Sequence, residues 1–385
     1  MTTRADLIIV GAGLAGSAAA WAASARGLAV VVLEAFAPGH RNGSSHGSAR
    51  IFRRAYPDPL YVRLAGRAER RWRELADEAG EPLLTMTGAL DFGRARDPAA
   101  LHAVLAGFGV PAELLTAAGA ARRWPFFDFG PGPVLYHPGA GVLDPERAMA
   151  AMLRLAAARG AVVSFGTPVT RLERTPSGDG AVAHTDRGRF TAPAVVVAAG
   201  PWTAPLLDGV IRLPPLTVTQ QSVFHFAPAP VTSTVPVTGT APAAPWPAFI
   251  CQDGADDCYG LPGGRDGEVP GAIKIGEHAG RRVTTADGRD FTVDPAARAR
   301  VTDFAARRLP GLRPVPVNEA TCLYTWTANE DFLLDRRGPF IVASPCSGHG
   351  AKFAPLTGDL IADLATGRPV PHPRFTLAAH ATPAP

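Results

Sequence analysis

The stretch from Asp6 to Glu34, DLIIVGAGLAGSAAAWAASARGLAVVVLE, decides the fold. Residues 6–10 form a short apolar run that favours a buried strand, and the Ala-rich segment 14–26 that follows favours a helix. Residues 28–33 form a second apolar run, which predicts another buried strand. A strand, a helix and a strand in this order predict a βαβ unit, in which the two strands lie parallel in one sheet.

Three glycines occupy the turn between the first strand and the helix: Gly11, Gly13 and Gly16. Their G-x-G-x-x-G spacing lets backbone N–H groups approach a pyrophosphate at the positive end of the helix. Glu34 ends the second strand, where a carboxylate can accept hydrogen bonds from a ribose. The unit therefore predicts a bound dinucleotide, against the alternative of a glycine-rich turn that binds nothing. The motif by itself does not distinguish FAD from NAD.

The bulk composition describes a globular protein that is large enough for two lobes. Its 385 residues exceed the size at which a single core stops growing, and 46% of them are hydrophobic and 19% charged. The net charge of +4 comes from scattered residues, without a basic run that indicates a nucleic-acid partner. Residues 7–25 carry no charge before Arg26, but their glycine spacing favours a phosphate loop over a membrane span. We therefore expect a cytoplasmic protein with no membrane partner.

Two residue types are used sparingly. The four cysteines lack the CxxC or Cys/His spacing of a zinc site, so we expect neither a metal centre nor a disulfide framework. Among 38 basic residues only Lys274 and Lys352 are lysines. Either a coding bias against lysine left these two by chance, or both positions need a compact charge on a flexible stem, which arginine does not provide.

The rest of the chain alternates between α/β segments and a strand-rich segment. Patterns in residues 59–80 and 144–159 predict amphipathic helices, and residues 194–199 predict a buried strand that ends at Gly200. A shorter strand at 162–164 precedes a hairpin whose strands, 169–175 and 181–185, flank a Pro/Ser/Gly turn. Residues 214–316 are Pro-rich and strand-like with one helix at 295–308, which is typical of a separate antiparallel lobe.

The C-terminal segment returns to an α/β pattern. Strands are predicted at 332–335 and 340–343, followed by a helix that begins near His349 and ends before Gly367. If this helix packs on the first βαβ unit, the cofactor domain is discontinuous in sequence. The Pro-containing tail after Gly367 is expected on the surface.

Four blocks of sequence resemble the monomeric sarcosine oxidase and N-methyltryptophan oxidase family. They occur in the family's order and span nearly the whole chain, which makes them more specific than the glycine loop. The blocks are Asn42–Gly47 (NGSSHG) with Ala49–Tyr56 (ARIFRRAY), Gly271–His278 (GAIKIGEH), Thr321–Thr325 (TCLYT) and Ser347–Phe353 (SGHGAKF).

This resemblance implies an α/β (α+β two-lobed) protein. A glutathione-reductase-like, Rossmann-type FAD-binding domain is expected from residues 1–85, 141–212 and 321–385, and an antiparallel-sheet substrate domain from residues 86–140 and 213–320. The family resemblance also implies a monomer that binds FAD, a small amine substrate and O2.

The resemblance implies roles for four side chains in particular. Cys322 matches the cysteine that forms a thioether to the flavin, although a buried cysteine is ordinarily a structural residue. Lys274 matches the lysine that assists oxygen reduction, because a fixed positive charge stabilises the negative charge that develops on oxygen. Arg53 and Lys352 match the pair that holds the substrate carboxylate. Both scarce lysines thereby acquire a function.

Further positions match residues around the substrate and the flavin. His278, Tyr259 and Tyr324 match the lining of the substrate pocket. The alternative to a binding role is that they are packing residues whose polar groups are hydrogen-bonded within the protein. Arg50 and His46 match residues near the flavin ring. The remaining expected cofactor contacts are Ser44, Val169, Gly200, Gly348, His349, Gly350 and Lys352 itself.

Some residues depart from the family pattern around the pocket entrance. Ala49 stands where a hydroxyl residue is common, and Trp326 where a smaller or charged side chain is common. Pro57 and Asp58 replace a more flexible acidic segment, and the loop 263–270 before Lys274 is longer. Because these changes touch the pocket, the substrate need not be sarcosine.

The resulting expectation is an FAD-dependent oxidation of a secondary amine, an N-methyl or cyclic amino acid, to an imine, with O2 reduced to H2O2. A tailoring oxidase that desaturates a cyclic or primary amino acid is an alternative from the same class. A non-catalytic flavin-binding module and a nicotinamide dehydrogenase are alternatives from other classes.

Overall fold

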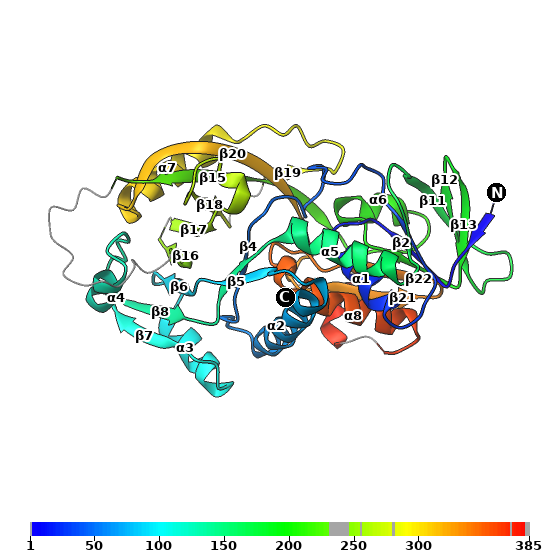
Figure 1. Cartoon of the computed structure of the whole chain (residues 1–385), viewed down its shortest axis with the longest axis horizontal. Helices are drawn as coiled ribbons and strands as arrows, with labels where there is room; N and C mark the ends of the chain where they lie inside the picture. The colour runs from blue at the N-terminus through cyan, green and yellow to red at the C-terminus, as the bar shows by residue number, and fades with distance from the viewer. Residues whose placement is uncertain (1, 231–245, 255, 279–281, 370–371, 382–385) are drawn as a thin grey trace.

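The computed structural model of the chain describes residues 2–230, 246–254, 256–278, 282–369 and 372–381. It has two lobes, and the expected mixed α/β class is confirmed (Figure 1). The lobe that carries the N-terminus contains a largely parallel sheet covered by helices. The other lobe contains a large, mainly antiparallel sheet. Residues 231–245 and 370–371, parts of the expected strand-rich lobe and of the tail, lie outside the described residues.

A six-stranded sheet forms the centre of the first lobe. Its order is β10-β3-β2-β14-β22-β21, parallel except for the last pair. The central strands β2, β3 and β14 are fully buried and consist of Val, Ile, Leu and Ala, as parallel strands covered on both faces require. Their bounds are β2 Leu7–Val10, β3 Val30–Leu33, β10 Val162–Ser164, β14 Ala194–Val197, β21 Leu333–Arg337 and β22 Phe340–Ser344.

Four helices pack on this sheet or on one another. Helix α1, Leu14–Ser24, contacts α5, Pro145–Ala158, and α8, Ala354–Ala365, which in turn contacts α2, Pro59–Ala79. The predicted βαβ unit is therefore present, with ends that differ by one or two residues. Helix α8 brings the C-terminal segment back beside α1, so the cofactor domain is discontinuous, as Figure 1 shows.

A smaller four-stranded sheet extends this lobe. The predicted hairpin corresponds to β11, Val169–Arg174, and β12, Ala181–Thr185. Two strands that the sequence did not reveal complete it: β13, Gly188–Ala192, and β1, Thr2–Arg4. Both are short, and their mixed polar composition gives no apolar alternation.

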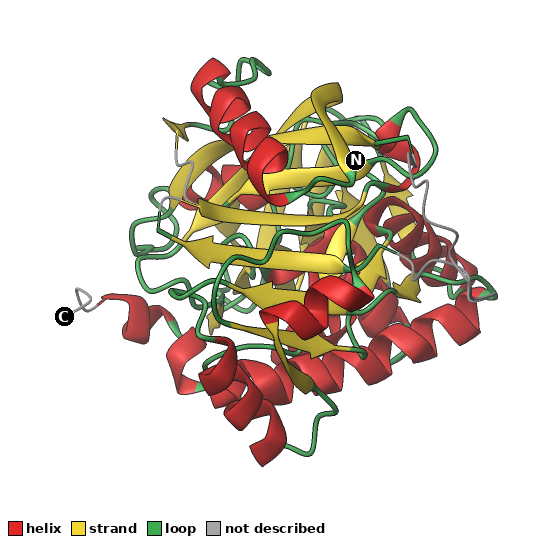
Figure 2. Cartoon of the chain, turned by 90° about the vertical axis from the view of Figure 1, so that its left-hand side faces the viewer, coloured by secondary structure: helices red, strands yellow, loops and turns green. Residues whose placement is uncertain are grey.

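The second lobe contains nine strands in the described residues, in the order β19-β15-β18-β17-β16-β6-β8-β7, with β20 paired to β15. Figure 2, which faces this lobe, shows its strands running side by side across the molecule. Their bounds are β6 Ala89–Phe92, β7 Glu113–Thr116, β8 Pro133–His137, β15 Thr217–Pro228, β16 Ala248–Asp253, β17 Asp256–Pro262, β18 Ile273–Glu277, β19 Arg282–Thr284 and β20 Leu312–Trp326.

Membership in this sheet supports the expected division of the chain into five segments, which we propose on that ground. Strands β6 to β8 come from residues 86–140, and β15 to β19 come from residues 213–320. The 15-residue strand β20 crosses the boundary expected after residue 320, so that boundary lies inside a continuous strand.

The predicted helix at 295–308 is present as α7, Pro295–Arg308, and covers one face of the large sheet. Val301 and Phe304 of this helix are buried against Phe224 and Phe249 of the sheet. Because side chains alternate between the faces of a strand, the other face is left for the functional site.

Four helices begin at an Asp-Pro step. Asp58, Asp97, Asp144 and Asp294 are the N-caps of α2, of α3 (Pro98–Gly107), of α5 and of α7, and each carboxylate accepts a backbone N–H of the first turn. Proline is suited to the first helical position because its missing N–H has no partner there. Pro57 and Asp58, which depart from the family pattern, have a local structural role here, because Asp58 is the residue that begins α2.

The remaining elements link the lobes or cover their edges. They are a three-stranded sheet of β4 (Arg50–Phe52), β9 (Gly141–Leu143) and β5 (Leu84–Met86), the helices α4 (Ala117–Arg123), α6 (Thr203–Leu207) and α9 (Leu377–Ala381), and the 3-10 turns η1 (Gly200–Trp202), η2 (Gly264–Gly267), η3 (Gly350–Phe353) and η4 (Pro373–Phe375).

Candidate active site

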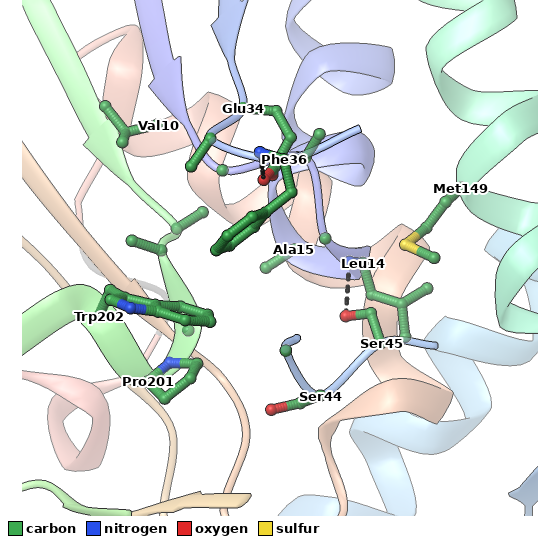
Figure 3. Close-up of a pocket in the computed structure, with 18 of the residues that line it drawn as sticks. Val10, Leu14, Ala15, Glu34, Phe36, Ser44, Ser45, Met149, Pro201 and Trp202 are labelled. Carbon is green, nitrogen blue, oxygen red and sulfur yellow. Dashed lines mark hydrogen bonds between the residues drawn. The ribbon is translucent and has the colours of Figure 1, made fainter. Parts of the chain in front are cut away.

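A cavity of about 1060 Å³ runs from the end of β3 to the large sheet. Figure 3 shows Phe36 and Trp202 on one side of it and Leu14, Ser45 and Met149 on the other. Its lining includes eleven of the sequence-predicted residues: Gly11, Gly13, Glu34, Ser44, His46, Arg50, Val169, Gly200, Tyr324, Gly348 and Gly350.

The glycine loop approaches its neighbours too closely for side chains. Gly11 has φ +99°, and a Cβ on it would lie 2.6 Å from the carbonyl oxygen of Ala198. Gly16 lines neither cavity; a Cβ there would lie 1.8 Å from the carbonyl oxygen of Gly11, so this glycine lets α1 pack against the loop. Gly13 and Leu14 begin the helix at the cavity wall, where its unpaired N–H groups favour an anion.

Glu34 is buried and held by the backbone. Its Oε2 accepts the N–H of Ala12 at 2.7 Å, and its Oε1 accepts the N–H of Phe36 at 3.0 Å. Each carboxylate oxygen has a further lone pair for a ligand hydroxyl. This arrangement fits a carboxylate that fixes a ribose at the end of the second strand.

Two aromatic residues at this end were not found from the sequence. The rings of Phe36 and Trp202 are 5.4 Å apart, and Phe36 is 4.7 Å from His40. Trp202 is held by a hydrogen bond from Nε1 to the carboxylate of Asp287. Both residues lie in loops or short turns, where no periodic pattern indicates burial or binding.

The loop from Gly43 to Arg50 forms another wall. The hydroxyl of Ser45 accepts the N–H of Leu14 at 3.1 Å, and the Arg50 guanidinium donates to the carbonyl oxygens of Ser44 and His46. Burial, followed by the charge of Arg50, lowers the pKa of His46 to about 2, so its imidazole is neutral at ordinary pH. Its Nε2 is buried and has no hydrogen-bond partner among the described residues, which leaves it available to a ligand.

The C-terminal loop closes the cavity from the opposite side. A Cβ on Gly348 would lie 3.0 Å from the Trp326 ring and 3.1 Å from the Tyr324 ring, and one on Gly350 would overlap the carbonyl of Pro345. Both positions therefore exclude side chains next to the cavity. His349 lines the smaller cavity and not the larger one.

A second cavity of about 200 Å³ adjoins the first and lies against the large sheet. Residues at every second position of five neighbouring strands line it, which is the pattern expected from one face of a sheet. These are Val223 and His225 of β15, Ile250 and Gln252 of β16, Asp257, Tyr259 and Leu261 of β17, Lys274 of β18, and Asn318, Ala320, Cys322 and Tyr324 of β20; Cys258 of β17, from an intervening position, also borders the cavity.

Lys274 is buried in this cavity wall. Its Nζ donates to the carbonyl oxygen of Ala49 at 3.4 Å. Burial, and then the charge of Arg50, lowers the pKa of Lys274 to about 7. Ala49 stands where the family commonly has a hydroxyl residue. It contacts the lysine through its backbone carbonyl, so this contact does not require a side-chain hydroxyl.

Cys322 and two tyrosines, Tyr259 and Tyr324, lie together in the wall of the smaller cavity. Cys322 is buried and lines the smaller cavity, while Tyr324 lines both. The hydroxyls of Tyr259 and Tyr324 are 3.3 Å apart. Burial raises the pKa of Tyr259 to about 12 and that of Tyr324 well above its usual value, so both hydroxyls remain protonated. The pair therefore supplies neutral hydrogen-bonding groups to the cavity.

Arg53 and Lys352 both lie close to the ring of Tyr56. The Arg53 guanidinium carbon is 4.4 Å from the Tyr56 ring centroid, and the Lys352 ammonium is 5.6 Å from it. Arg53 donates to the carbonyl oxygen of Ala55, and Lys352 donates to that of His349 at 2.8 Å. Burial lowers the pKa of both cations, each also being affected by a neighbouring cation. In the described residues neither forms an ion pair with a carboxylate, so the cavity offers two cations to an anion.

Two histidines border this pair. His349 lies between the Tyr56 hydroxyl, 3.1 Å from Nδ1, and the carbonyl oxygen of Glu330, and burial lowers its pKa to about 3. His278 lies edge-on to Trp326, with ring centroids 5.8 Å apart, and lines the cavity. Trp326 is fixed by a hydrogen bond from Nε1 to Thr219. This tryptophan, which departs from the family pattern, therefore adds a rigid ring behind His278.

The structure thus brings together most residues singled out from the sequence. Arg53, Lys274, His278, Cys322 and Lys352 line the smaller cavity, together with Tyr259 and Tyr324. Val169 and Gly200 line only the larger cavity and do not belong to this group.

In the longer loop before Lys274, the carboxylate of Asp266 accepts the N–H of Ser48 at 2.6 Å and so fixes the 43–50 loop.

The residues around the larger cavity fit FAD. Glycines leave a cradle at the positive end of α1, Glu34 is fixed beside it, and the cavity continues to the sheet face that holds Lys274.

Within the described residues, no cluster of three or more His, Cys, Asp or Glu side chains forms a metal site. No helix among them is both long and apolar enough to span a membrane.

Comparisons with known proteins agree on one family. The family model for FAD dependent oxidoreductases matches residues 6–364. The chain is 35% identical to the monomeric sarcosine oxidase of Streptomyces avermitilis, with 97% of this chain and 96% of that protein covered. It is 30% identical to the N-methyl-L-tryptophan oxidase of Citrobacter koseri, with 94% and 95% covered.

Solved structures extend the comparison. NikD, an unusual amino acid oxidase essential for nikkomycin biosynthesis, superposes with a TM-score of 0.82 at 27% identity over 99% of this chain and 98% of that one. L-proline dehydrogenase from P. horikoshii, at 20% identity, shares the fold with a TM-score of 0.83 over all of both chains. The chain belongs to the FAD dependent oxidoreductase family, among the relatives of monomeric sarcosine oxidase and N-methyl-L-tryptophan oxidase, and is an FAD-dependent oxidoreductase.

Proposed function

We propose that the chain oxidises a secondary amine that carries a carboxylate, an N-methyl or cyclic amino acid, to an imine, and passes the electrons to O2 to give H2O2. The observation that carries this proposal is the pair of buried cations, Arg53 and Lys352, in a small cavity that adjoins the larger one. The names of the relatives, sarcosine oxidase and N-methyl-L-tryptophan oxidase, support the same amine class.

The two cations would fix the position of the substrate. A carboxylate between Arg53 and Lys352 replaces the anion that neither cation has in the described residues, and charge-assisted hydrogen bonds would hold it strongly. With the carboxylate fixed, the α-carbon and the amine lie toward the junction of the cavities, where Tyr259 and Tyr324 meet. Fixed orientation of this kind lowers the entropic part of the barrier.

When bound, FAD would supply the acceptor for a hydride equivalent from a C–H bond next to the amine nitrogen, on the N-methyl group or in the ring, and the donor of two electrons to O2. The neutral side chains around the junction suit an uncharged amine, which is the reactive form. His46 and His349 both have lowered pKa values because of burial, and the tyrosine hydroxyls stay protonated, so none of them places a full charge beside the amine.

Two further roles are part of the proposal. Cys322 would hold the flavin covalently through its sulfur; it lines the smaller cavity two residues before Tyr324, which lines both cavities. Lys274 would provide the positive charge for oxygen reduction, since its Nζ is buried in the same wall with only a carbonyl oxygen as its hydrogen-bond acceptor in the described residues. We also propose that the protein is monomeric and cytoplasmic, which sedimentation of the purified protein and cell fractionation would test.

A peroxide-coupled screen tests the function. FAD-loaded protein should form H2O2 with one or more N-methyl or cyclic amino acids, and far less with the same amines lacking the carboxylate. Absence of peroxide and of flavin bleaching with every member of such a panel would overturn the proposal.

The second candidate is a tailoring oxidase that desaturates a cyclic or primary amino acid without loss of a carbon; the likeness to NikD, an amino acid oxidase essential for nikkomycin biosynthesis, supports an amino acid as the substrate. Released aldehyde identifies N-demethylation, whereas a cyclic imine with no aldehyde identifies the alternative.

A further inference from the structure

A third cation, Arg96, lies beside Arg53 in the smaller cavity. Both guanidinium groups donate to one acceptor, the carbonyl oxygen of Ala55, and the hydrogen bond from Arg96 Nη2 is 3.1 Å long. Two like charges on a shared acceptor, in a buried setting, repel each other unless an anion lies nearby. Arg53, Arg96 and Lys352 therefore form one group of cations in the cavity lining, since Arg53 shares Ala55 with Arg96 and the Tyr56 ring with Lys352.

Arg96 is held in place by the sheet. The N–H groups of Ala95 and Arg96 both donate to the carbonyl oxygen of Gln252 on β16, at 3.0 and 3.3 Å. Arg96 Nε donates to Asp91 Oδ1 at 2.6 Å, and the side chains of the two residues are 9% and 0% exposed. Asp91 is in register with Ile250, which lines the cavity, so the carboxylate lies on the cavity face of the sheet.

This ion pair leaves part of the guanidinium free. Nε is used by Asp91 and Nη2 by Ala55, whereas Nη1 has no acceptor among the described residues. An arginine fork offers five N–H donors, so Arg96 can still bind a planar anion. Asp91 therefore does more than neutralise Arg96: it orients the guanidinium and leaves donors free to bind a ligand.

The charge balance points the same way. Within the group of Arg53, Arg96 and Lys352, the one ion-pair carboxylate in the described residues is Asp91, so a substrate with a single carboxylate leaves one positive charge of this group uncompensated. Two acids line the cavity, but their hydrogen bonds go elsewhere: Asp257 accepts from Gln252, and Asp266 accepts from Ser48. In the described residues neither forms an ion pair with the three cations. A substrate with a second carboxylate would balance the charge of this group.

We propose that Arg96, oriented by Asp91, binds a second carboxylate of the substrate, so that the preferred substrates are N-alkyl amino dicarboxylic acids. This inference rests on the amine oxidation proposed above, but binding of a dianion tests it separately. Arg96 is thus a specificity-determining residue, and Asp91 a positioning residue that acts through it.

The decisive measurement is calorimetric titration of the FAD-loaded protein with succinate and with butyrate, which match in length but differ by one carboxylate. Succinate should bind at least about tenfold more tightly, the size of one hydrogen bond between charged groups. Removing Arg96 alone would leave Asp91 buried and unpaired, so the test variant is the charge-balanced D91N/R96Q. The preference should disappear in it. The matched control is Arg94→Gln, an exposed arginine on the same loop, which should keep the preference.

Oxidation provides the second arm, with N-methyl-L-aspartate compared to N-methyl-L-asparagine. A kcat/KM ratio above about ten in the wild type that falls to about one in D91N/R96Q supports the inference. Equal binding of succinate and butyrate, or a preference that survives in D91N/R96Q, overturns it even if neutral N-methyl amino acids are oxidised. Tight succinate binding without oxidation of any amine would instead leave the dianion site standing and reject the proposed function.

Discussion

His225 and Lys274 lie directly opposite each other on the antiparallel strands β15 and β18. Burial, and then the charge of Lys274, lowers the pKa of His225 to about 4, so the imidazole is neutral and Lys274 carries the charge of the pair. The lysine is therefore the group whose protonation state changes near neutral pH. Its charge has no carboxylate to balance it within hydrogen-bond reach in the described residues.

Lys274→Met should slow the reoxidation of reduced flavin by O2 by about a hundredfold or more, the usual cost of removing a preorganised charge worth about 3 kcal/mol. Reduction of the flavin by the amine should change much less, because Lys274 contacts neither cation of the carboxylate pair. Stopped-flow spectroscopy separates the two half-reactions. Reoxidation within a few-fold of the wild-type rate would show that the charge of Lys274 is not used.

The same reoxidation step should depend on pH. The protonated ammonium is the active form, and it is present below the pKa of about 7 and lost above it. The rate constant should therefore fall as pH rises through about 7, and a bound anionic flavin would move this midpoint upward by favouring the ammonium. Lys274→Met should remove the transition. A wild-type rate constant that is flat up to pH 10 would contradict this assignment.

Cys322→Ser should abolish covalent attachment of the flavin. Cys322 lines the smaller cavity two residues before Tyr324, which lines both cavities, and the serine hydroxyl is too weak a nucleophile to replace a thiolate. Wild-type protein precipitated with acid should stay yellow, while the flavin of the variant should appear in the supernatant. Cys251→Ser is a suitable control, because Cys251 is buried in the core beneath α7. Release of all flavin from the wild type would contradict the prediction.

Lys352→Met should raise the KM for an N-methyl amino acid by roughly 10- to 100-fold, as expected for a lost hydrogen bond between charged groups. A secondary amine of the same shape without the carboxylate should show almost no change. Steady-state kinetics with both substrates measures the difference. Equal effects on the two would indicate that Lys352 supports the fold instead of binding the carboxylate.

Gly11→Ala should impair FAD binding and lower stability. The residue has φ +99°, and the new Cβ would meet the carbonyl oxygen of Ala198 at 2.6 Å. Gly107→Ala, at a position with nothing within 4 Å, is the matched control and should leave the melting temperature nearly unchanged or raised. The measurements are the flavin content after purification and thermal unfolding. Full flavin content in Gly11→Ala would show that the loop can shift.

The sequence predicted the parts of the fold that depend on local pattern. The βαβ unit was predictable because strands β2 and β3 are continuous apolar runs, and helix α7 because Asp294 and Pro295 mark its start. Strands β7 and β13 were not recognised, because they are short and have no apolar alternation. Their strand form depends on pairing with neighbours that are distant in sequence.

The site was predictable only where a motif or a resemblance named the residue. Lys274 and Lys352 could be suspected from lysine scarcity alone. Arg96 could not, since its importance depends on Asp91 and Ala55, which only the fold brings beside it. Phe36 and Trp202 were missed for the same reason, because two loop aromatics become a pair only when β3 and η1 meet at the cavity.

Strand β20 has a consequence for how such a protein can evolve. It pairs with β15 along the large sheet, and around its C-terminal end hydrogen bonds join Thr325, within the strand, and Thr327, just past it, to Ser347 of the C-terminal loop. The lobes are therefore not interchangeable modules, since a graft at the domain border would have to cut one strand. New substrates are more readily acquired by exchanging side chains at alternate positions of the cavity face, where one codon changes the lining and leaves the backbone pairing intact.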